Sequence, residues 1–400
     1  MDIDTGATAW VLISAALVLM MVPAVGLFYG GMVRRKNVIS TMMLSFVALA
    51  LGVVQWIIIG YSLAFGSDTA GLIGSLEYLG LGNIGLDGIT NGIPDVLFIC
   101  FQMMFACLAL AILSSGVVGR VKMSSYIVFG LLWLTIVYAP LAHWAWGGGW
   151  ASQLGALDFA GGTVVHISSG FAALALALVI GKRIGFGTQN FAPHNIPMTL
   201  LGGMFLILGW FGFNAGSALA ADTLAANAFL VTAAACATGA LTWMFISWIG
   251  GKPGSLGFIS GAIAGLVGIT PAAGYVNVMG AMLIGIITAA VCYFFLNLRM
   301  KKGLDESLDA WAIHGMGGFT GAILTGIFAV SAICGVGGLL EGNIAQFGVQ
   351  CLDAVIAAVY AFGVTALLAW IINKTIGLRA TTEEEYVGLD LAQHGEQLND

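Results

Sequence analysis

The chain has 400 residues, of which 60% are hydrophobic and only 8% charged, and its formal net charge is −6. Soluble domains carry about 25% charged residues, so this composition excludes a soluble enzyme. The acidic balance excludes nucleic-acid binding, which needs a basic surface. The six cysteines include no CxxC pair and predict buried thiols rather than a disulfide framework or a zinc site. We therefore predict a polytopic all-α membrane protein with no enzymatic activity, metal or cofactor.

Eleven apolar stretches come close to the length of about 20 residues that crosses the hydrocarbon core of a bilayer. The segment 255–271 is the shortest of them and is rich in glycine, which is typical of helices that pack backbone to backbone. The eleven predicted spans are 8–31, 39–65, 94–118, 124–143, 161–181, 197–218, 225–249, 255–271, 275–298, 309–332 and 348–373.

The basic residues orient these spans in the membrane. All 13 Lys and Arg residues lie in the loops that follow odd-numbered spans. The charged residues of the opposite loops are all acidic. By the positive-inside rule, the N-terminus lies outside and the C-terminus in the cytoplasm. We predict a transmembrane domain over 1–374 and a cytoplasmic tail over 375–400.

An odd number of spans fits two inverted five-helix repeats plus a final helix, an arrangement common in transporters. The fifth and tenth spans then correspond to each other. Each carries an acid near its start and a histidine further in, Asp158 with His166 and Asp309 with His314. The two spacings differ, being eight and five residues.

His166 and His314 are the main candidates for function, because an ionisable side chain inside a membrane is costly. Three interpretations remain open at this point. The histidines pack in the core and bond to backbone carbonyls, they ligate a haem between two helices, or they line a narrow path. In the third case the neutral imidazole supplies both a hydrogen-bond donor and an acceptor.

Asp158 and several aromatic residues lie near the predicted outer end of the spans. A carboxylate at a helix start caps free N–H groups, and Asp158 is such a cap, a charge that attracts a cation, or both. Trp146, Phe105 and Phe213 are either interfacial and core residues or the faces of a site for a small cation. Phe101 shares a helix face with Phe105, four residues away.

Several long strings resemble the ammonium transporter family (Amt/Mep/Rh), and the likeness covers almost the whole chain. The strings are 26–37 (GLFYGGMVRRKN), 158–166 (DFAGGTVVH) with 181–183 (GKR), 209–217 (GWFGFNAGS), 260–268 (SGAIAGLVG), 377–379 (GLR) and 388–395 (GLDLAQHG).

This resemblance implies a homotrimer in which each subunit has its own pore. It implies an outer ammonium site, a gate of two stacked phenyl rings beneath it, a pore with a histidine pair, and an acid needed for transport. The implied residues are Trp146, Ser217, Phe105 and Phe101 for the outer site, Phe105 and Phe213 for the gate, His166 and His314 for the pore, and Asp158 for the acid.

The resemblance also implies that a PII-type regulatory protein docks on the cytoplasmic face. One departure from the family pattern lies before Arg120, where the chain reads Gly116-Val-Val-Gly119 and many members have an acid. Any contact in the inner loops that depends on that acid is therefore in question.

We predict an ammonium transporter of the plasma membrane, which recruits ammonium outside, deprotonates it and conducts ammonia, with or without a separately relayed proton. The alternatives are an ammonium sensor, a related channel for a neutral gas such as carbon dioxide, and a haem oxidoreductase. A sensor would need an output domain, and only a short tail follows the last predicted span.

Overall fold

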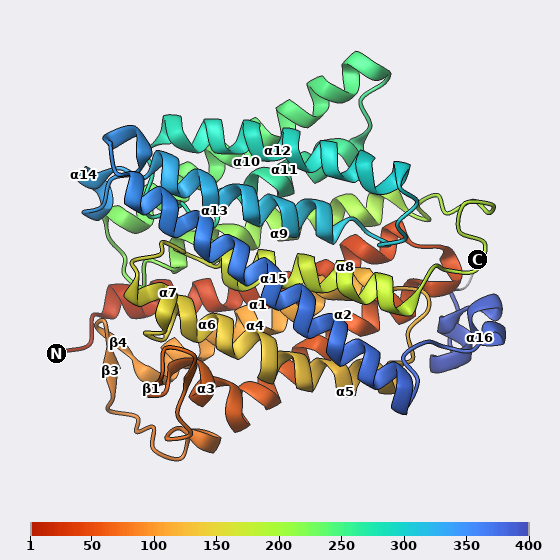
Figure 1. Ribbon diagram of the computed structural model, residues 1–400, viewed down its shortest axis with the longest axis horizontal. Coiled ribbons are helices and arrows are strands. Elements are labelled where there is room, and N and C mark those ends of the chain that lie inside the picture. The colour runs from red at the N-terminus through yellow and green to blue at the C-terminus, as the bar shows by residue number, and fades with distance from the viewer. Residues whose placement is uncertain (1, 399–400) are drawn as a thin grey trace.

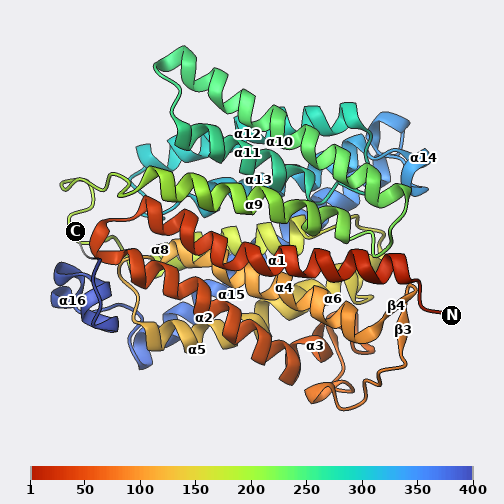
Figure 2. The ribbon, with the colours of Figure 1, turned by 180° about the vertical axis from the view of Figure 1, so that it is seen from behind.

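The computed structural model describes residues 2–398 and is a bundle of helices that run along its long axis (Figure 1). The N-terminus and the C-terminus lie at opposite ends of the bundle in both views (Figures 1 and 2). Helix α1 runs along the face seen in Figure 2, and α15 crosses the opposite face diagonally (Figure 1).

The longer helices have the following bounds: α1 Thr5–Met32, α2 Val38–Gln55, α4 Asp95–Leu113, α5 Met123–Trp133, α8 Ser168–Ile180, α9 Ile196–Gly216, α10 Thr223–Gly250, α11 Ser255–Ile269, α12 Val278–Lys301, α13 Met316–Phe328 and α15 Ile344–Thr375. The shorter helices are α3 Tyr61–Phe65, α6 Ala139–Trp146, α7 Trp150–Gln153, α14 Ser331–Cys334 and α16 Thr382–Val387.

Tighter and wider turns interrupt or extend these helices. The 3-10 turns are Arg35–Asn37, Leu79–Leu81, Ser114–Gly116 and Leu339–Glu341. The π-helical turns are Trp56–Gly60, Leu134–Tyr138, Gly162–Ile167, Trp311–Gly315 and Asp390–His394. Two short antiparallel hairpins, β1 (Asp68–Thr69) with β2 (Ile73–Gly74) and β3 (Ile89–Thr90) with β4 (Ile93–Pro94), lie at the end that holds the N-terminus (Figure 1).

The prediction of an all-α polytopic membrane protein is confirmed. Within residues 2–398, nine helices are long and apolar enough to cross a membrane. The eighth predicted span, 255–271, contains α11, which is shorter, and the tenth, 309–332, contains a π-helical turn followed by α13. Each of the eleven predicted stretches thus contains a helix, while the count of eleven spans, their orientation and the inverted repeat stay predictions.

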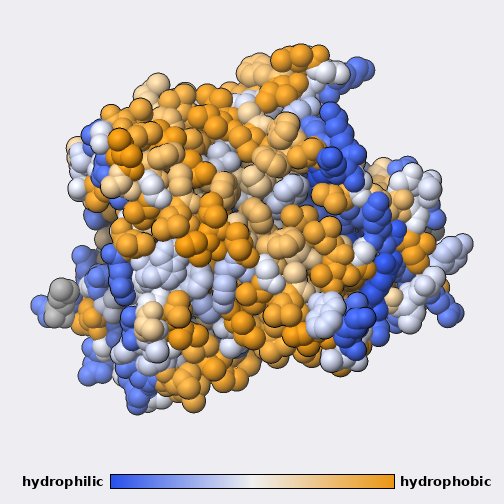
Figure 3. Space-filling model, viewed as in Figure 1, coloured by the Kyte–Doolittle hydropathy of each residue, from blue (hydrophilic) through white to orange (hydrophobic). Residues whose placement is uncertain are grey.

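One span ends later than predicted. The helical run that contains 124–143 begins at Met123 and ends with α6 at Trp146, and α7 (Trp150–Gln153) follows as a separate short helix after the non-helical residues 147–149. The hydropathy of the surface agrees with a membrane protein, because hydrophobic residues cover the middle of the face in Figure 3 and hydrophilic residues gather at both ends.

Glycine allows the helices to touch along their backbones. A Cβ atom at Gly202 in α9 would lie 2.4 Å from the backbone nitrogen of Phe28 in α1. Because that separation is far below contact distance, no larger side chain fits between the two helices as they stand. Small residues at such crossings are typical of membrane helices, whose association depends on close packing.

At the end that holds the C-terminus, Arg120 is fully buried, although the four residues immediately before it include no acid. Its guanidinium donates to the backbone oxygens of Gly116 (3.0 Å) and Asp305 (2.6 Å) and lies 4.0 Å from the Asp305 carboxylate. Burial lowers the pKa of Arg120 to about 10, and the charge of Asp305 opposes that shift. The acid that pairs with Arg120 therefore comes from another loop.

Asp305 also pairs with Arg183, whose Nη2 lies 2.5 Å from its carboxylate. Burial by itself would raise the pKa of Asp305, but the hydrogen bonds and charge of Arg183 together with the charge of Arg120 outweigh it, and the pKa lies below its ordinary value. This carboxylate thus joins the loops that follow the third, fifth and ninth predicted spans.

The residues after α15 pack against the loop that follows α1. Lys36 donates to the backbone oxygen of Glu385 (2.9 Å), and the backbone N–H of Leu389 donates to Asn37 Oδ1 (3.0 Å). Arg379 pairs with the Glu385 carboxylate at 2.7 Å. The predicted tail 375–400 is thus docked as far as the structure describes it, and its positions 399–400 lie outside the described residues.

Asp390 caps α2 from this tail. Its carboxylate accepts the backbone N–H groups of Ile39 (3.0 Å) and Ser40 (2.7 Å), and α2 has no side-chain cap from its own N-cap residue. We expect Asp390→Ala to weaken the docking by about 0.5–2 kcal/mol, the usual loss for a removed cap. A Glu-specific protease should then cleave at Glu383 to Glu385 several times faster.

The matched control is Glu396→Ala, which removes the same charge from an exposed position. Equal cleavage rates for both variants would contradict the role of Asp390 as a cap.

Candidate functional site

A cavity of about 540 Å³ lies near the end of the bundle that holds the β-hairpins. It brings together three of the four residues expected in the outer ammonium site, Trp146, Phe105 and Ser217. They come from α6, α4 and the residue that follows α9. The rest of the wall is Tyr61, Phe65, Tyr78, Thr90, Asn91, Phe98, Gln102, Ala145, Phe159 and Leu219.

Phe101, the fourth residue expected there, is not among the residues that line this cavity. Its side chain is fully buried and packs edge-on against Phe105 at 4.8 Å between ring centroids. The shared helix face brings both rings together, but only Phe105 reaches the cavity. Phe101 therefore packs against Phe105 rather than facing a ligand.

Hydrogen bonds hold the polar atoms of this cavity in fixed orientations. The indole N–H of Trp146 donates to the backbone oxygen of Asp158 (2.8 Å), and the Ser217 hydroxyl donates to the backbone oxygen of Phe213 (2.8 Å). Because the single hydrogen of Ser217 is engaged, that oxygen offers lone pairs only. The Oε1 atom of Gln102 is buried without a hydrogen-bond partner.

Asp158 does not line this cavity, and its carboxylate caps the segment that carries His166. One oxygen accepts the N–H groups of Gly161 (2.9 Å) and Gly162 (2.6 Å), and the other those of Thr163 (2.9 Å) and Val164 (3.2 Å). Gly161 has φ +124°, a conformation that favours glycine. Of the two interpretations of Asp158, the geometry favours the helix cap.

Phe105 and Phe213 separate this cavity from the histidines. Their ring centroids are 4.6 Å apart and their planes meet at 69°, so they pack edge to face and are not stacked as we expected. Edge-to-face contact is a preferred geometry for aromatic rings. On its other side Phe213 is stacked on His166, with centroids 5.7 Å apart and planes at 14°.

His166 and His314 contact each other directly. Each lies in a π-helical turn, Gly162–Ile167 and Trp311–Gly315, and their Nδ1 atoms are 3.2 Å apart. Single π-turns are frequent at functional sites. This shared feature agrees with the proposed correspondence of the fifth and tenth spans.

The contact between the rings bears on the three interpretations of the histidines. Two ligands of one haem iron lie on opposite faces of the porphyrin, whereas these nitrogens face each other at hydrogen-bond distance. The rings bond to each other, and His166 bonds to Thr270, rather than to backbone carbonyls. The geometry therefore favours the lining of a narrow path.

Glycine sets the distance between the two histidine segments. Gly170 in α8 touches Gly315, and a Cβ atom at Gly170 would lie 2.1 Å from the Gly315 nitrogen. A Cβ atom at Gly318 would lie 2.8 Å from the Cβ atom of His166. The hydrogen bond between the histidines thus depends on the absence of side chains at these crossings.

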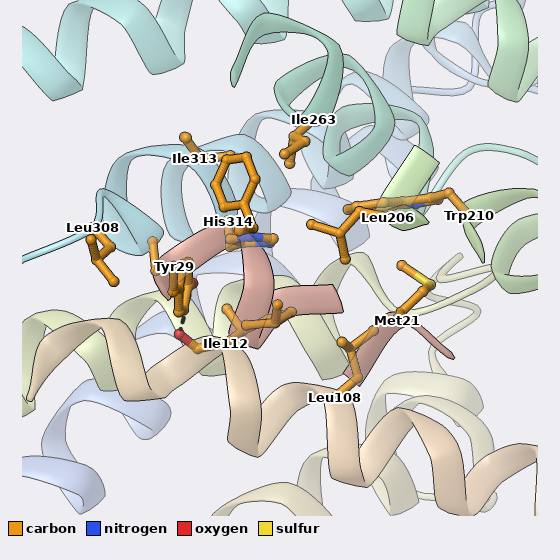
Figure 4. A pocket seen from close by; sticks show the side chains of 13 residues that line it. Met21, Tyr29, Leu108, Ile112, Leu206, Trp210, Ile263, Leu308, Ile313 and His314 are labelled. Atoms are coloured by element: carbon orange, nitrogen blue, oxygen red, sulfur yellow. Dashed lines mark hydrogen bonds between the residues drawn. The ribbon is translucent and has the colours of Figure 1, made fainter. Parts of the chain in front are cut away.

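A second, much smaller cavity lies on the other side of the histidines (Figure 4). Its volume of about 20 Å³ is room for one water-sized molecule. His314, Trp210 and Tyr29 bring polar atoms to an otherwise apolar wall, and the Tyr29 hydroxyl donates to the backbone oxygen of Ile112 (3.1 Å). The remaining lining residues are Met21, Val25, Phe28, Leu108, Ile112, Leu206, Ile263, Leu308, Ala310 and Ile313.

Asp309, the acid before His314, differs from Asp158. Its carboxylate pairs with Arg299 at 2.6 Å instead of capping the helix with its side chain, and its φ is +67°. The two acids thus act on their histidine segments in different ways.

Sequence reasoning missed Gln102, Thr270 and Tyr29. Gln102 carries an amide inside an apolar span between Phe101 and Phe105, and Thr270 is a polar residue next to Pro271. These are visible signals, but polar residues of this kind occur in many membrane helices. Only the folded structure shows that Gln102 and Tyr29 line the cavities and that Thr270 contacts His166.

Comparison with known proteins shows the family to which the chain belongs. The model of the Ammonium Transporter Family matches residues 9–398. Ammonium transporter Amt1 of Archaeoglobus fulgidus is 54% identical over 391 residues, and an ammonium transporter of Bacillus subtilis is 47% identical over 398 residues; each match covers 98% of both chains. The crystal structure of Mep2 from Saccharomyces cerevisiae matches with a TM-score of 0.91 at 38% identity, over 96% of this chain and 89% of that one. The chain therefore belongs to the ammonium transporter family.

Proposed function

We propose that this protein binds ammonium in the outer cavity, removes its proton there and passes ammonia along the histidine pair into the inner cavity. The observation that carries the proposal is the difference between the cavities. The outer one is large and bordered by aromatic faces and oxygen atoms, whereas the inner one has room for a single small molecule between largely apolar walls.

The outer cavity suits a cation that can donate hydrogen bonds. Aromatic faces of Trp146 and Phe105 attract a desolvated cation by about 2 kcal/mol. Ser217 offers lone pairs because its hydrogen is engaged with Phe213, and the side chain of Gln102 adds a polar group to the wall. Ammonium has N–H groups for these lone pairs, whereas potassium has none, so the site favours ammonium.

The proton is lost before the histidines because the path beyond Phe105 is apolar and narrow. A charge at the centre of a bilayer costs at least about 2.5–3.5 kcal/mol. The side chain of lysine, with a reference pKa of about 10.4, is a model for ammonium, and full burial lowers such a pKa by about 3–5 units. Neutral ammonia then passes Phe213 and hydrogen-bonds to the histidine pair.

Family membership and the arrangement of the chain support further proposals about its assembly. We infer a homotrimer in the plasma membrane, with the N-terminus outside. A PII-type protein then docks on the cytoplasmic face, where the tail packs on the inner loops. Asp158 acts in this scheme as a positioning residue for the segment that carries His166.

Transport in proteoliposomes tests the proposed function. We expect ammonium to enter in a saturable manner and potassium to be excluded. Replacing both His166 and His314 with leucine should reduce ammonium uptake by at least tenfold, because the path then offers no hydrogen bond to ammonia. A current that accompanies uptake means that the proton also crosses, and uptake without current means net passage of neutral ammonia.

The same measurement separates the alternatives. The relatives at 54% and 47% identity are named ammonium transporters, which favours transport over sensing and over enzymatic activity. Carbon dioxide uptake without ammonium uptake would favour a neutral-gas channel. The absence of any uptake would contradict the proposal.

A further inference from the structure

The hydroxyl group of Thr270 contacts three groups at the centre of the path. Its Oγ1 lies 2.9 Å from Trp210 Nε1, 2.8 Å from the backbone oxygen of Leu266 and 3.3 Å from His166 Nε2. A hydroxyl has one hydrogen and two lone pairs. It can therefore donate to only one of these neighbours and must accept from the other two.

The end of α11 indicates which neighbour receives the hydrogen. This helix ends at Ile269, and the backbone N–H of Thr270 bonds to Val267 (3.3 Å) rather than to Leu266. Pro271 follows and has no N–H to offer. The carbonyl of Leu266 is thus one of the free acceptors at a helix end, and the Thr270 hydroxyl donates to it at the shortest of its three distances.

The two lone pairs of Thr270 then face two donors. Trp210 is one, because an indole nitrogen only donates. His166 Nε2 is the other, so this atom carries a hydrogen. A neutral imidazole has one N–H, and the Nδ1 atom of His166 is therefore bare.

The hydrogen on His314 follows from the contact between the rings. Because Nδ1 of His166 is bare, the Nδ1 atom of His314 at 3.2 Å carries the hydrogen of that bond. His314 Nε2 is then bare as well. Of the two histidines, His314 is the one that lines the inner cavity (Figure 4).

We propose that Thr270 is a positioning residue that sets the tautomers of both histidines, so that the bare Nε2 of His314 accepts a hydrogen bond from ammonia in the inner cavity. The assignment of the tautomers stands on the hydrogen-bond geometry, and the role toward ammonia rests on the proposed function. The opposite orientation of the Thr270 hydroxyl would put an N–H on His314 Nε2 and turn it into a donor. The Thr270 hydroxyl lines neither cavity. It nevertheless decides whether His314 presents a hydrogen-bond donor or an acceptor to a ligand in the inner cavity.

The nitrogen-15 NMR spectrum of histidine-labelled protein in bilayers tests the tautomers, because bare and protonated ring nitrogens have well-separated shifts. The chain has five histidines, and the single variants His166→Leu and His314→Leu identify the signals of the pair. In the wild type we expect a protonated Nε2 for His166 and a protonated Nδ1 for His314. The reverse pattern would overturn the proposal without any reference to transport.

Three variants test the role of the hydroxyl. Thr270→Val removes it at nearly constant shape, and we expect mixed tautomers and roughly tenfold slower ammonium uptake, the effect of one hydrogen bond of about 1.4 kcal/mol. Thr270→Ser keeps the hydroxyl and should restore both readouts. The matched control is Thr365→Val, which removes the acceptor of the buried Trp133 indole (3.0 Å), a threonine that lines neither cavity.

Each outcome has a distinct meaning. Unchanged tautomers in Thr270→Val would overturn the role of Thr270, and so would an equal loss of uptake in Thr365→Val, which would indicate a general packing defect. If the wild type shows the expected tautomers but takes up no ammonium, the proposed function fails while the tautomer assignment stands. If Thr270→Val does not fold, the spectrum of the wild type still shows whether His166 and His314 have the expected tautomers.

Discussion

Replacing Asp158 with alanine is expected to abolish ammonium uptake and to lower the free energy of unfolding by several kcal/mol. The carboxylate accepts four backbone N–H groups from residues 161–164, and only 6% of the residue is exposed. Each buried donor that loses its partner costs about 1–3 kcal/mol. Without these bonds the π-helical turn that carries His166 loses the support that orients it.

Asparagine should be almost as damaging at this position. An amide has one accepting oxygen and one donating nitrogen, so it satisfies one pair of N–H groups and points a donor at the other. Thermal unfolding in detergent together with uptake in liposomes measures both effects. If Asp158→Asn remained as stable as the wild type but did not transport, the charge itself would be what transport needs, and the role as a cap would be wrong.

Asp222 provides the matched control for Asp158. It caps α10 by accepting the N–H groups of Leu224 (2.9 Å) and Ala225 (3.0 Å), and it is exposed. Water can replace this cap, so Asp222→Ala should cost only about 0.5–2 kcal/mol. Its uptake should stay close to that of the wild type.

Adding a single methyl group at Gly170 is expected to reduce uptake on the order of a hundredfold. The new Cβ atom would lie 2.1 Å from the nitrogen and 2.3 Å from the Cα atom of Gly315, and neither backbone atom can rotate away. The two histidine segments must then separate, and the 3.2 Å contact between His166 and His314 breaks. A displacement near 1 Å at a reacting site can cost this much, and overpacking destabilises by about 1–3 kcal/mol.

Gly363→Ala is the matched control, because a Cβ atom at that position in α15 would meet no atom within 4 Å. Alanine is the better helix former, so this variant should be at least as stable as the wild type and should transport normally. Normal transport by Gly170→Ala would show that the histidines do not depend on the spacing of their segments.

Local patterns in the sequence determined the class of the protein. The apolar stretches and the placement of Lys and Arg depend only on residues close in the chain and on the bilayer, which is why each predicted stretch contains a helix. The family motifs named the residues that border the cavities and the histidine pair. The helix that contains the end of the span predicted at 124–143 continues to Trp146, through residues that the local pattern treated as a loop.

Contacts between residues far apart in the chain decided how the side chains of the site are arranged. Phe101 and Phe105 share a helix face, but only the packing of the helices places Phe105 at the cavity and buries Phe101 against it. Asp158 caps four backbone N–H groups of the segment that carries His166, and Arg120 finds its acid in Asp305. Which atom bonds to which depends on side chains that meet across helices, and a sequence lists those residues without the distances that join them.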